Sequence, residues 1–175
     1  MTREMKDKMA ETVQDYHLPR YEEIPNVGLY LEQVVKYISD YLAPLGDVMI
    51  TGSMISNYVK QKLIESPVKK QYNRDQIASL IFIAIAKSVL SLENIQTILE
   101  MQRATYEAKR AYEYFCREFE NLLFYAFGIN DTYVAEGVED SDQKMILRNV
   151  LIAISHKIHV EKCLAVVSRE LEQTN

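Results

Sequence analysis

Residues Met49 to Leu99 read MITGSMISNYVKQKLIESPVKKQYNRDQIASLIFIAIAKSVLSLENIQTIL, and this stretch decides the fold. Its pattern predicts a short helix, a basic turn and two further helices. A side-chain cap from Thr51 or Ser53 begins the first helix, and Pro67 prevents a helix from continuing through the turn. Apolar residues recur in the first helix at helical spacing, which predicts one buried face and one polar face.

The second helix of this stretch is expected to lie at the centre of the core. Asn73 followed by Gln76 is a capping-box start, and residues 77–90 are apolar on most sides. The β-branched run IFIAI is also compatible with a buried strand. The capped start, the alanines and the length of the segment favour a helix, and Ser91 begins the next one.

Outward from this stretch, further helical patterns predict an all-α fold class. Residues 29–42 form an amphipathic pattern, which predicts a supporting helix. Residues 106–127 predict a long amphipathic helix ended by Gly128, and residues 142–171 predict the last helix. We expect an N-terminal arm over 1–25, a helical domain over 26–101, and a C-terminal helical hairpin over 102–175.

The last predicted helix is apolar on more than one side of its first half. Two C-terminal helices alone are too few to cover this apolar surface, so we expect a homo-oligomer formed through the C-terminal region.

The chain has 175 residues and a formal net charge of −5. Its charge is unevenly distributed, because residues 51–75 contain five basic and two acidic residues, a net +3, which leaves −8 for the remainder. An acidic protein with one basic contact face shows such an asymmetry. The alternative is that these lysines form a solvated surface that only maintains solubility.

Several other classes of protein are not indicated. No uncharged apolar run is long enough to span a membrane, and the polar first residues do not resemble a signal peptide. Cys116 and Cys163 are far apart in sequence, which suits reduced thiols. We therefore expect a cytoplasmic protein.

Catalytic and metal-binding chemistry is also not indicated. Neighbouring carboxylates, such as Glu118 and Glu120, have no His, Cys or Ser partner in a catalytic pattern. His156 and His159 lie three residues apart without further ligands, so no metal site is predicted. No glycine-rich phosphate loop is present, and we expect neither an enzyme nor a cofactor.

The stretch from 49 to 99 resembles the winged helix-turn-helix of the MerR-like DNA-binding regulators. The matching residues are Tyr58, Leu63, Pro67, Lys70, Tyr72 and Ser91-Leu92-Glu93. The wider pattern of LPRYEE, GLY and SMISNYVKQKLI is similar to an uncharacterised bacterial family known only as a domain of unknown function. The chain departs from the MerR-like pattern at Ser56, where an Arg is usual, and at Lys62, where a Gly is usual.

The resemblance implies a transcriptional regulator that binds double-stranded DNA with its first helix in the major groove and its basic turn on the backbone. Ser56, Asn57 and Gln61 are of the right type to reach base edges. Hydroxyl and cationic side chains suit phosphate contact. The candidate DNA-binding residues are Ser53, Ser56, Asn57, Tyr58, Lys60, Gln61, Lys69, Lys70, Tyr72 and Arg74. The two tyrosines are also expected to pack partly between the turn and the helix.

Two alternatives remain open. The competing hypothesis is a non-enzymatic protein-interaction module on the same scaffold. Ser56 and Lys62, in place of the usual Arg and Gly, favour it, as does the acidic remainder of the chain. The C-terminal hairpin offers a third possibility, a small-molecule pocket lined by Tyr112, Phe115, Phe119 and Ile154. Sequence alone does not distinguish such a pocket from a packed core.

Overall fold

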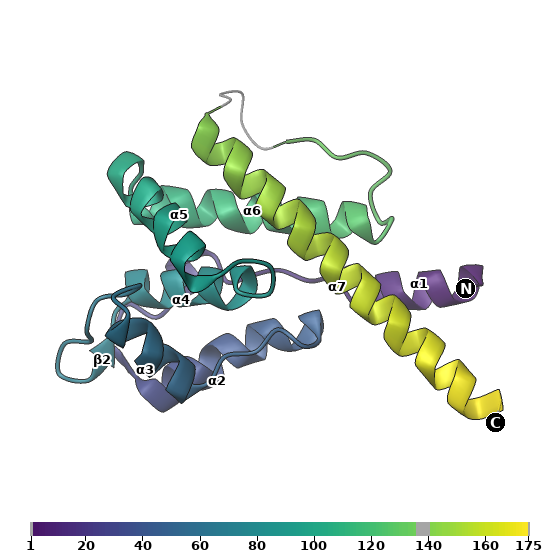
Figure 1. The fold of residues 1–175 in the computed structure, drawn as a ribbon, viewed down its shortest axis with the longest axis horizontal. Coiled ribbons are helices and arrows are strands. Elements are labelled where there is room, and N and C mark those ends of the chain that lie inside the picture. The colour runs from purple at the N-terminus through teal and green to yellow at the C-terminus, as the bar shows by residue number, and fades with distance from the viewer. Residues whose placement is uncertain (1, 136–140, 175) are drawn as a thin grey trace.

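The computed structural model describes residues 2–135 and 141–174, and most of these residues are helical (Figure 1). The α-helices are α1 (Arg3–Glu11), α2 (Leu31–Leu42), α3 (Gly52–Lys60), α4 (Arg74–Ala86), α5 (Leu92–Thr105), α6 (Ala108–Ala126) and α7 (Asp142–Thr174). Shorter elements are the 3-10 turns η1 (Tyr21–Glu23) and η2 (Ala43–Leu45) and the strands β1 (Leu29–Tyr30) and β2 (Gln71–Tyr72). The predicted predominance of α-helix is confirmed.

Helix starts in the central stretch follow from local side-chain caps. The Thr51 hydroxyl, rather than that of Ser53, accepts a hydrogen bond from the Met54 N–H at 3.2 Å and begins α3. At the start of α4, Asn73 and Gln76 form the predicted reciprocal capping box, with bonds of 2.9 and 2.8 Å. These caps satisfy backbone N–H groups that a helix cannot satisfy internally.

Helix α4 is the centre of the core. Ten of its residues are buried, and Ile77, Ile81 and Ile85 have no exposed surface. The helix packs against α2, α6 and α7, which explains why it carries no polar face. The helical interpretation of the IFIAI run is therefore correct, and the strand alternative is wrong.

A short antiparallel ladder joins the start of α2 to the start of α4. Leu29 pairs with Tyr72, and Tyr30 pairs with Gln71. The helix predicted from residue 29 consequently begins two residues later, because Leu29 and Tyr30 are taken into the ladder. Gly28 permits this close approach, since a Cβ at this position would lie only 2.7 Å from the Cβ of Gln71.

The N-terminal arm crosses α6 and is fixed to it by polar contacts. The Leu18 N–H donates to Glu120 at 2.9 Å, and Arg20 donates twice to the same carboxylate at 3.0 and 2.6 Å. The Tyr112 hydroxyl donates to the Pro19 carbonyl at 3.0 Å. Residues 18–20 of the predicted arm are therefore fixed to α6.

Helices α6 and α7 form the C-terminal hairpin, and α6 also packs on α4 (Figure 1). The sequence predicted a boundary between residues 101 and 102. Buried residues before and after this boundary belong to one hydrophobic core, so the packing continues across it. Gly128 follows α6 with a φ of +70°, which fits the predicted role of a helix end. Among the described residues, no helix combines the length and apolar character needed to cross a bilayer.

Candidate nucleic-acid interface

Helix α3 has an apolar face against the core and a polar face toward solvent. Its buried side includes Ile55 and Tyr58. The exposed side chains are Ser53, Ser56, Asn57 and Lys60, with Gln61 directly after the helix. The Gln61 Nε2 donates to Asn57 Oδ1 at 3.2 Å, so two amide side chains lie together on the exposed face. Amides of this kind are suited to bidentate contacts with base edges.

Helix α3 ends in a Schellman motif with a lysine at the position usually taken by glycine. The Leu63 N–H donates to the Tyr58 carbonyl and the Lys62 N–H to the Val59 carbonyl, both at 3.0 Å. Lys62 has a φ of +61°, in the left-handed region. The glycine missing from the sequence pattern is therefore replaced by a lysine that adopts the conformation for which glycine is preferred.

Lys69 and Lys70 form the tip of a tight turn between Val68 and Gln71. Their φ values are +51° and +65°, and the Gln71 N–H donates to the Val68 carbonyl at 2.9 Å. Positive φ at both central residues is the arrangement of a type I′ turn, for which Asn-Gly is the preferred sequence. Val68 and both lysines are exposed, so the turn presents two ammonium groups to solvent.

Arg74 does not belong to this exposed group, and its assignment to phosphate contact is corrected. Its Nε donates to the Ile24 carbonyl at 2.8 Å and its Nη1 to Glu22 at 2.6 Å. The guanidinium also lies 5.2 Å from the centroid of the Tyr21 ring. Arg74 thus fastens the N-terminal arm to the start of α4, and its side chain is only 16% exposed.

Tyr58 and Tyr72 pack more completely than expected. They are 3% and 4% exposed, and burial raises the pKa of both phenols. Tyr58 lies on the inner side of α3, while Tyr72 pairs with Leu29 in the ladder. Both tyrosines therefore lie behind the exposed surface of α3 and the turn.

Two long-range hydrogen bonds hold the segment between α3 and the turn. Arg103 on α5 donates from Nη2 to the Leu63 carbonyl at 2.9 Å. Gln76 on α4 donates from Nε2 to the Glu65 carbonyl at 2.9 Å. Neither role is predictable from the sequence, because no local pattern links residues that are 40 and 11 positions apart.

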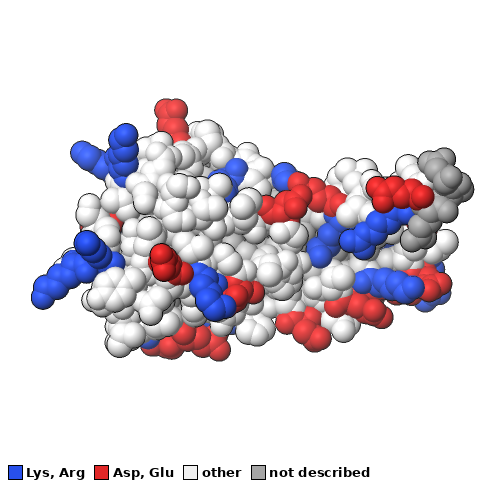
Figure 2. Space-filling view, turned by 90° about the horizontal axis from the view of Figure 1, so that it is seen from below, with Lys and Arg blue, Asp and Glu red and all other residues white. Residues whose placement is uncertain are grey.

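Basic side chains gather at the end of the molecule that carries α3 and β2. Figure 2 shows Lys and Arg side chains projecting from this end, whereas basic and acidic side chains are mixed at the opposite end. Lys60, Lys62, Lys69 and Lys70 are all exposed there. We call α3 with the turn at 68–71 and these four lysines the basic end.

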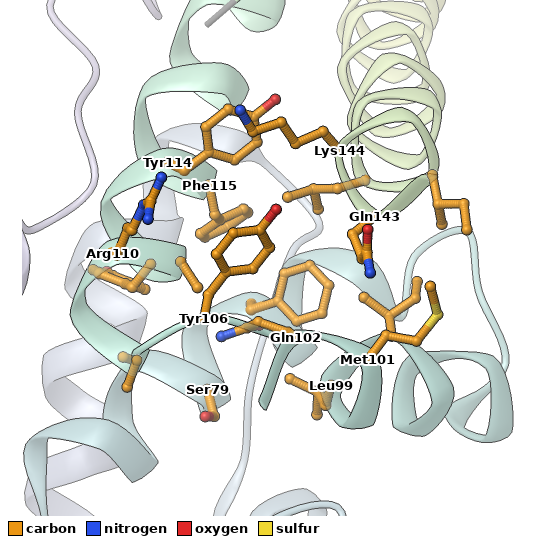
Figure 3. Close-up of a pocket in the computed structure, with 18 of the residues that line it drawn as sticks. Ser79, Leu99, Met101, Gln102, Tyr106, Arg110, Tyr114, Phe115, Gln143 and Lys144 are labelled. Atoms are coloured by element: carbon orange, nitrogen blue, oxygen red, sulfur yellow. The ribbon is translucent and has the colours of Figure 1, made fainter. Parts of the chain in front are cut away.

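A separate cavity of about 250 Å³ lies between α4, α5, α6 and α7 (Figure 3). Tyr112 and Phe115 line it, as the small-molecule alternative predicted. Phe119 and Ile154 do not line it, since both are fully buried in the core. The predicted pocket thus exists in part, and the rest of its wall comes from α4, α5, α7 and other residues of α6.

The carboxylates and histidines noted in the sequence have structural contacts. Buried Glu118 accepts hydrogen bonds from Tyr133 and from the Arg148 Nε, the latter at 2.8 Å. The hydrogen bond to Glu118 raises the pKa of Arg148, so the guanidinium stays protonated. The His159 ring packs edge-on against Phe127, and burial lowers its pKa. Within the described residues, no group of three His, Cys, Asp or Glu side chains is placed to hold a metal.

Comparison with curated proteins and with solved structures finds no match. A family model does match residues 19–115, which include the N-terminal arm from Pro19, the basic end and the first part of α6. This match covers more than half of the chain. The chain therefore belongs to the family described as Domain of unknown function (DUF1836).

Proposed function

We propose that this protein is a DNA-binding transcriptional regulator of the MerR-like type, with α3 as the recognition helix and the turn at 68–71 as the wing. In this proposal the exposed face of α3 enters the major groove. The wing lies over the flanking phosphates. Base contacts fall to Ser56, Asn57 and Gln61, while lysines supply the backbone contacts.

The observation that carries the proposal is the backbone of Lys69 and Lys70. Each left-handed residue without glycine costs about 1–2 kcal/mol, and lysine cannot recover this cost through local hydrogen bonds as Asn does. Backbone strain of this kind is concentrated at functional sites. Two exposed lysines in the two strained positions of a turn are best explained by a need for their charges.

The order of elements also supports the proposal. A supporting helix, α2, is followed by α3, the basic turn, β2 and the capped helices α4 and α5, as in the MerR-like pattern. Lys62 departs from that pattern in residue type but adopts the left-handed conformation that a glycine takes at a helix end. Ser56 lacks the guanidinium of the usual Arg, and its hydroxyl donates to the Gly52 carbonyl at 2.9 Å.

The test replaces Lys69-Lys70 by Asn-Gly, the preferred sequence for this turn. We expect the variant to unfold at a higher temperature, because the strain of about 1–2 kcal/mol per residue is relieved. We also expect it to lose at least about tenfold in affinity for duplex DNA at low salt, since two phosphate contacts disappear. Thermal unfolding and fluorescence anisotropy with a labelled duplex measure the two effects.

A matched control keeps the charges. Lys69→Arg with Lys70→Arg retains two cations in the same turn, so duplex affinity should stay within about threefold of the wild type. If the Asn-Gly variant bound duplex DNA as tightly as the wild type, the turn would not contact DNA and the proposed wing would be wrong.

The acidic body of the chain favours a second candidate, a protein-interaction module on the same scaffold. Outside residues 51–75 the net charge is −8, which opposes approach to DNA except through the basic end. Duplex binding by the wild type and by the Asn-Gly variant, measured side by side, separates the two candidates. Loss of duplex binding with an intact fold supports the regulator, whereas absence of duplex binding by the wild type at low salt supports the module.

A further inference from the structure

The cavity between α4, α5, α6 and α7 is open to solvent, so a small molecule can reach it. Its volume is about 250 Å³. An engineered cavity of ~150 Å³ is already large enough to bind benzene. The space is therefore sufficient for a small aromatic molecule.

Aromatic rings form much of the cavity wall. Phe82 from α4 and Phe115 from α6 meet edge to face with centroids 5.3 Å apart, and Tyr112 lies beside Phe115. Figure 3 shows the Tyr106 ring in the middle of the group, with Lys144 and Tyr114 on one side and Gln102 and Leu99 on the other. Such walls suit a flat aromatic body, because ring pairs prefer offset or edge-to-face contact.

Basic side chains are placed at the same cavity. The Arg110 guanidinium lies 5.5 Å from the centroid of the Tyr106 ring, and the Lys144 ammonium lies 5.4 Å from that of Tyr114. Arg117 is a third basic residue of the lining. Asp75 is the single acidic residue among the described residues that line the cavity, and its carboxylate accepts a hydrogen bond from Tyr21.

The first turns of α6 and α7 add to this positive character. Ala108 and Arg110 lie in the first turn of α6, Gln143 and Lys144 follow Asp142 in the first turn of α7, and all four line the cavity. The side chain of Glu107 makes no capping bond to the start of α6. Helix N-termini carry partial positive charge and favour anions, here next to three basic side chains.

We propose that this cavity binds a compact aromatic anion, with the ring among Phe82, Tyr106 and Phe115 and the acidic group near Arg110 and Lys144. The proposal goes beyond the DNA-binding function and does not depend on it. A regulatory role would rest on that function. A structural connection between the cavity and the basic end exists. Gln102 lines the cavity, and the next residue, Arg103, donates a hydrogen bond to the Leu63 carbonyl directly after α3.

The test titrates the full chain, without DNA, with 2-naphthoate and with its neutral counterpart 2-naphthamide, by calorimetry. We expect 2-naphthoate to bind at least about tenfold more tightly, because a charge-assisted contact is available only to the anion. Failure of 2-naphthoate to bind the folded wild type overturns the proposal, as does equal affinity for the two compounds.

Variants locate the binding. Lys144→Gln with Arg110→Gln should erase the preference for the anion, while Arg169→Gln, an exposed basic residue elsewhere on α7, should preserve it. Ala111→Phe and Ser79→Leu each fill the cavity from a different helix, and each folded variant should lose binding of 2-naphthoate. Unchanged binding in either folded filling variant would place the ligand elsewhere and contradict the proposal.

Discussion

Three residues other than glycine have positive φ in the described part of the chain, and all three are lysines at the basic end. They are Lys62, Lys69 and Lys70. Lysine has no short polar side chain with which to stabilise this conformation, so each position costs about 1–2 kcal/mol. These three lysines lower the stability of the fold. Residues that lower stability are typical of surfaces that function in binding.

Lys62 allows a direct measurement of this cost. Lys62→Gly should raise the free energy of unfolding by about 1 kcal/mol, because glycine adopts the C-terminal position of a Schellman motif without steric strain. For a chain of this size the melting temperature should rise by about 2–4 °C. Lys60→Gly is the control, since a glycine inside α3 should lower the melting temperature. A lower melting temperature for Lys62→Gly would contradict the strain argument.

At the scale of elements, Glu120 is one of the residues that join the N-terminal arm to α6. Its carboxylate receives hydrogen bonds from the Leu18 N–H and from both outer nitrogens of Arg20. The Glu120 side chain is 9% exposed and that of Arg20 is 37% exposed. The contact raises the pKa of Arg20, mainly through the hydrogen bonds to Glu120.

Glu120→Ala should therefore release the arm. The variant leaves a buried N–H and a guanidinium without their partner, which should cost roughly 2–3 kcal/mol. Amide hydrogen exchange over residues 17–25 should become faster. Asp40→Ala, which removes an exposed pair with Lys36, is the control and should change stability by less than ~0.5 kcal/mol. Unaltered exchange of the arm in Glu120→Ala would show that its other contacts hold it without Glu120.

The elements differ in how far the sequence could predict them. The starts of α3 and α4 were predicted because Thr51 and Asn73 act on residues within one helical turn. The ladder of β1 with β2 and the clasp of Arg74 on Ile24 were missed, because each joins segments more than 40 residues apart. The polar face of α3 was predicted from helical spacing, whereas the strained turn appears only in the backbone angles.

At the scale of the whole molecule, the basic end and the two chain ends lie at opposite ends of the long axis (Figure 1). Helix α7 reaches from the cavity to the C-terminal end. Val160, Leu164 and Val167 are exposed along it, continued by Leu171. Their spacing of four, three and four residues is the apolar seam of a coiled coil. We therefore expect two copies to pair through α7, with one basic end at each extremity.

Leu164→Glu with Val167→Glu tests this pairing. The double variant should be monomeric at concentrations at which the wild type is dimeric, because two charges enter the apolar seam. Light scattering after size-exclusion chromatography gives the mass, and circular dichroism confirms the fold. Ala165→Glu, one residue outside the seam, should leave the dimer intact. A monomeric wild type at all concentrations would contradict the expectation.

Selection of bound duplexes from a random pool at two salt concentrations tests whether the basic end reads duplex DNA. We predict enrichment of a symmetric motif whose half-sites are about 10–10.5 base pairs apart or a multiple of this. If each of the four lysines contacts one phosphate, the slope of log affinity against log salt concentration should be about −3.6 for each basic end. A pool without any enriched motif, or an affinity that does not change with salt, would contradict the claim.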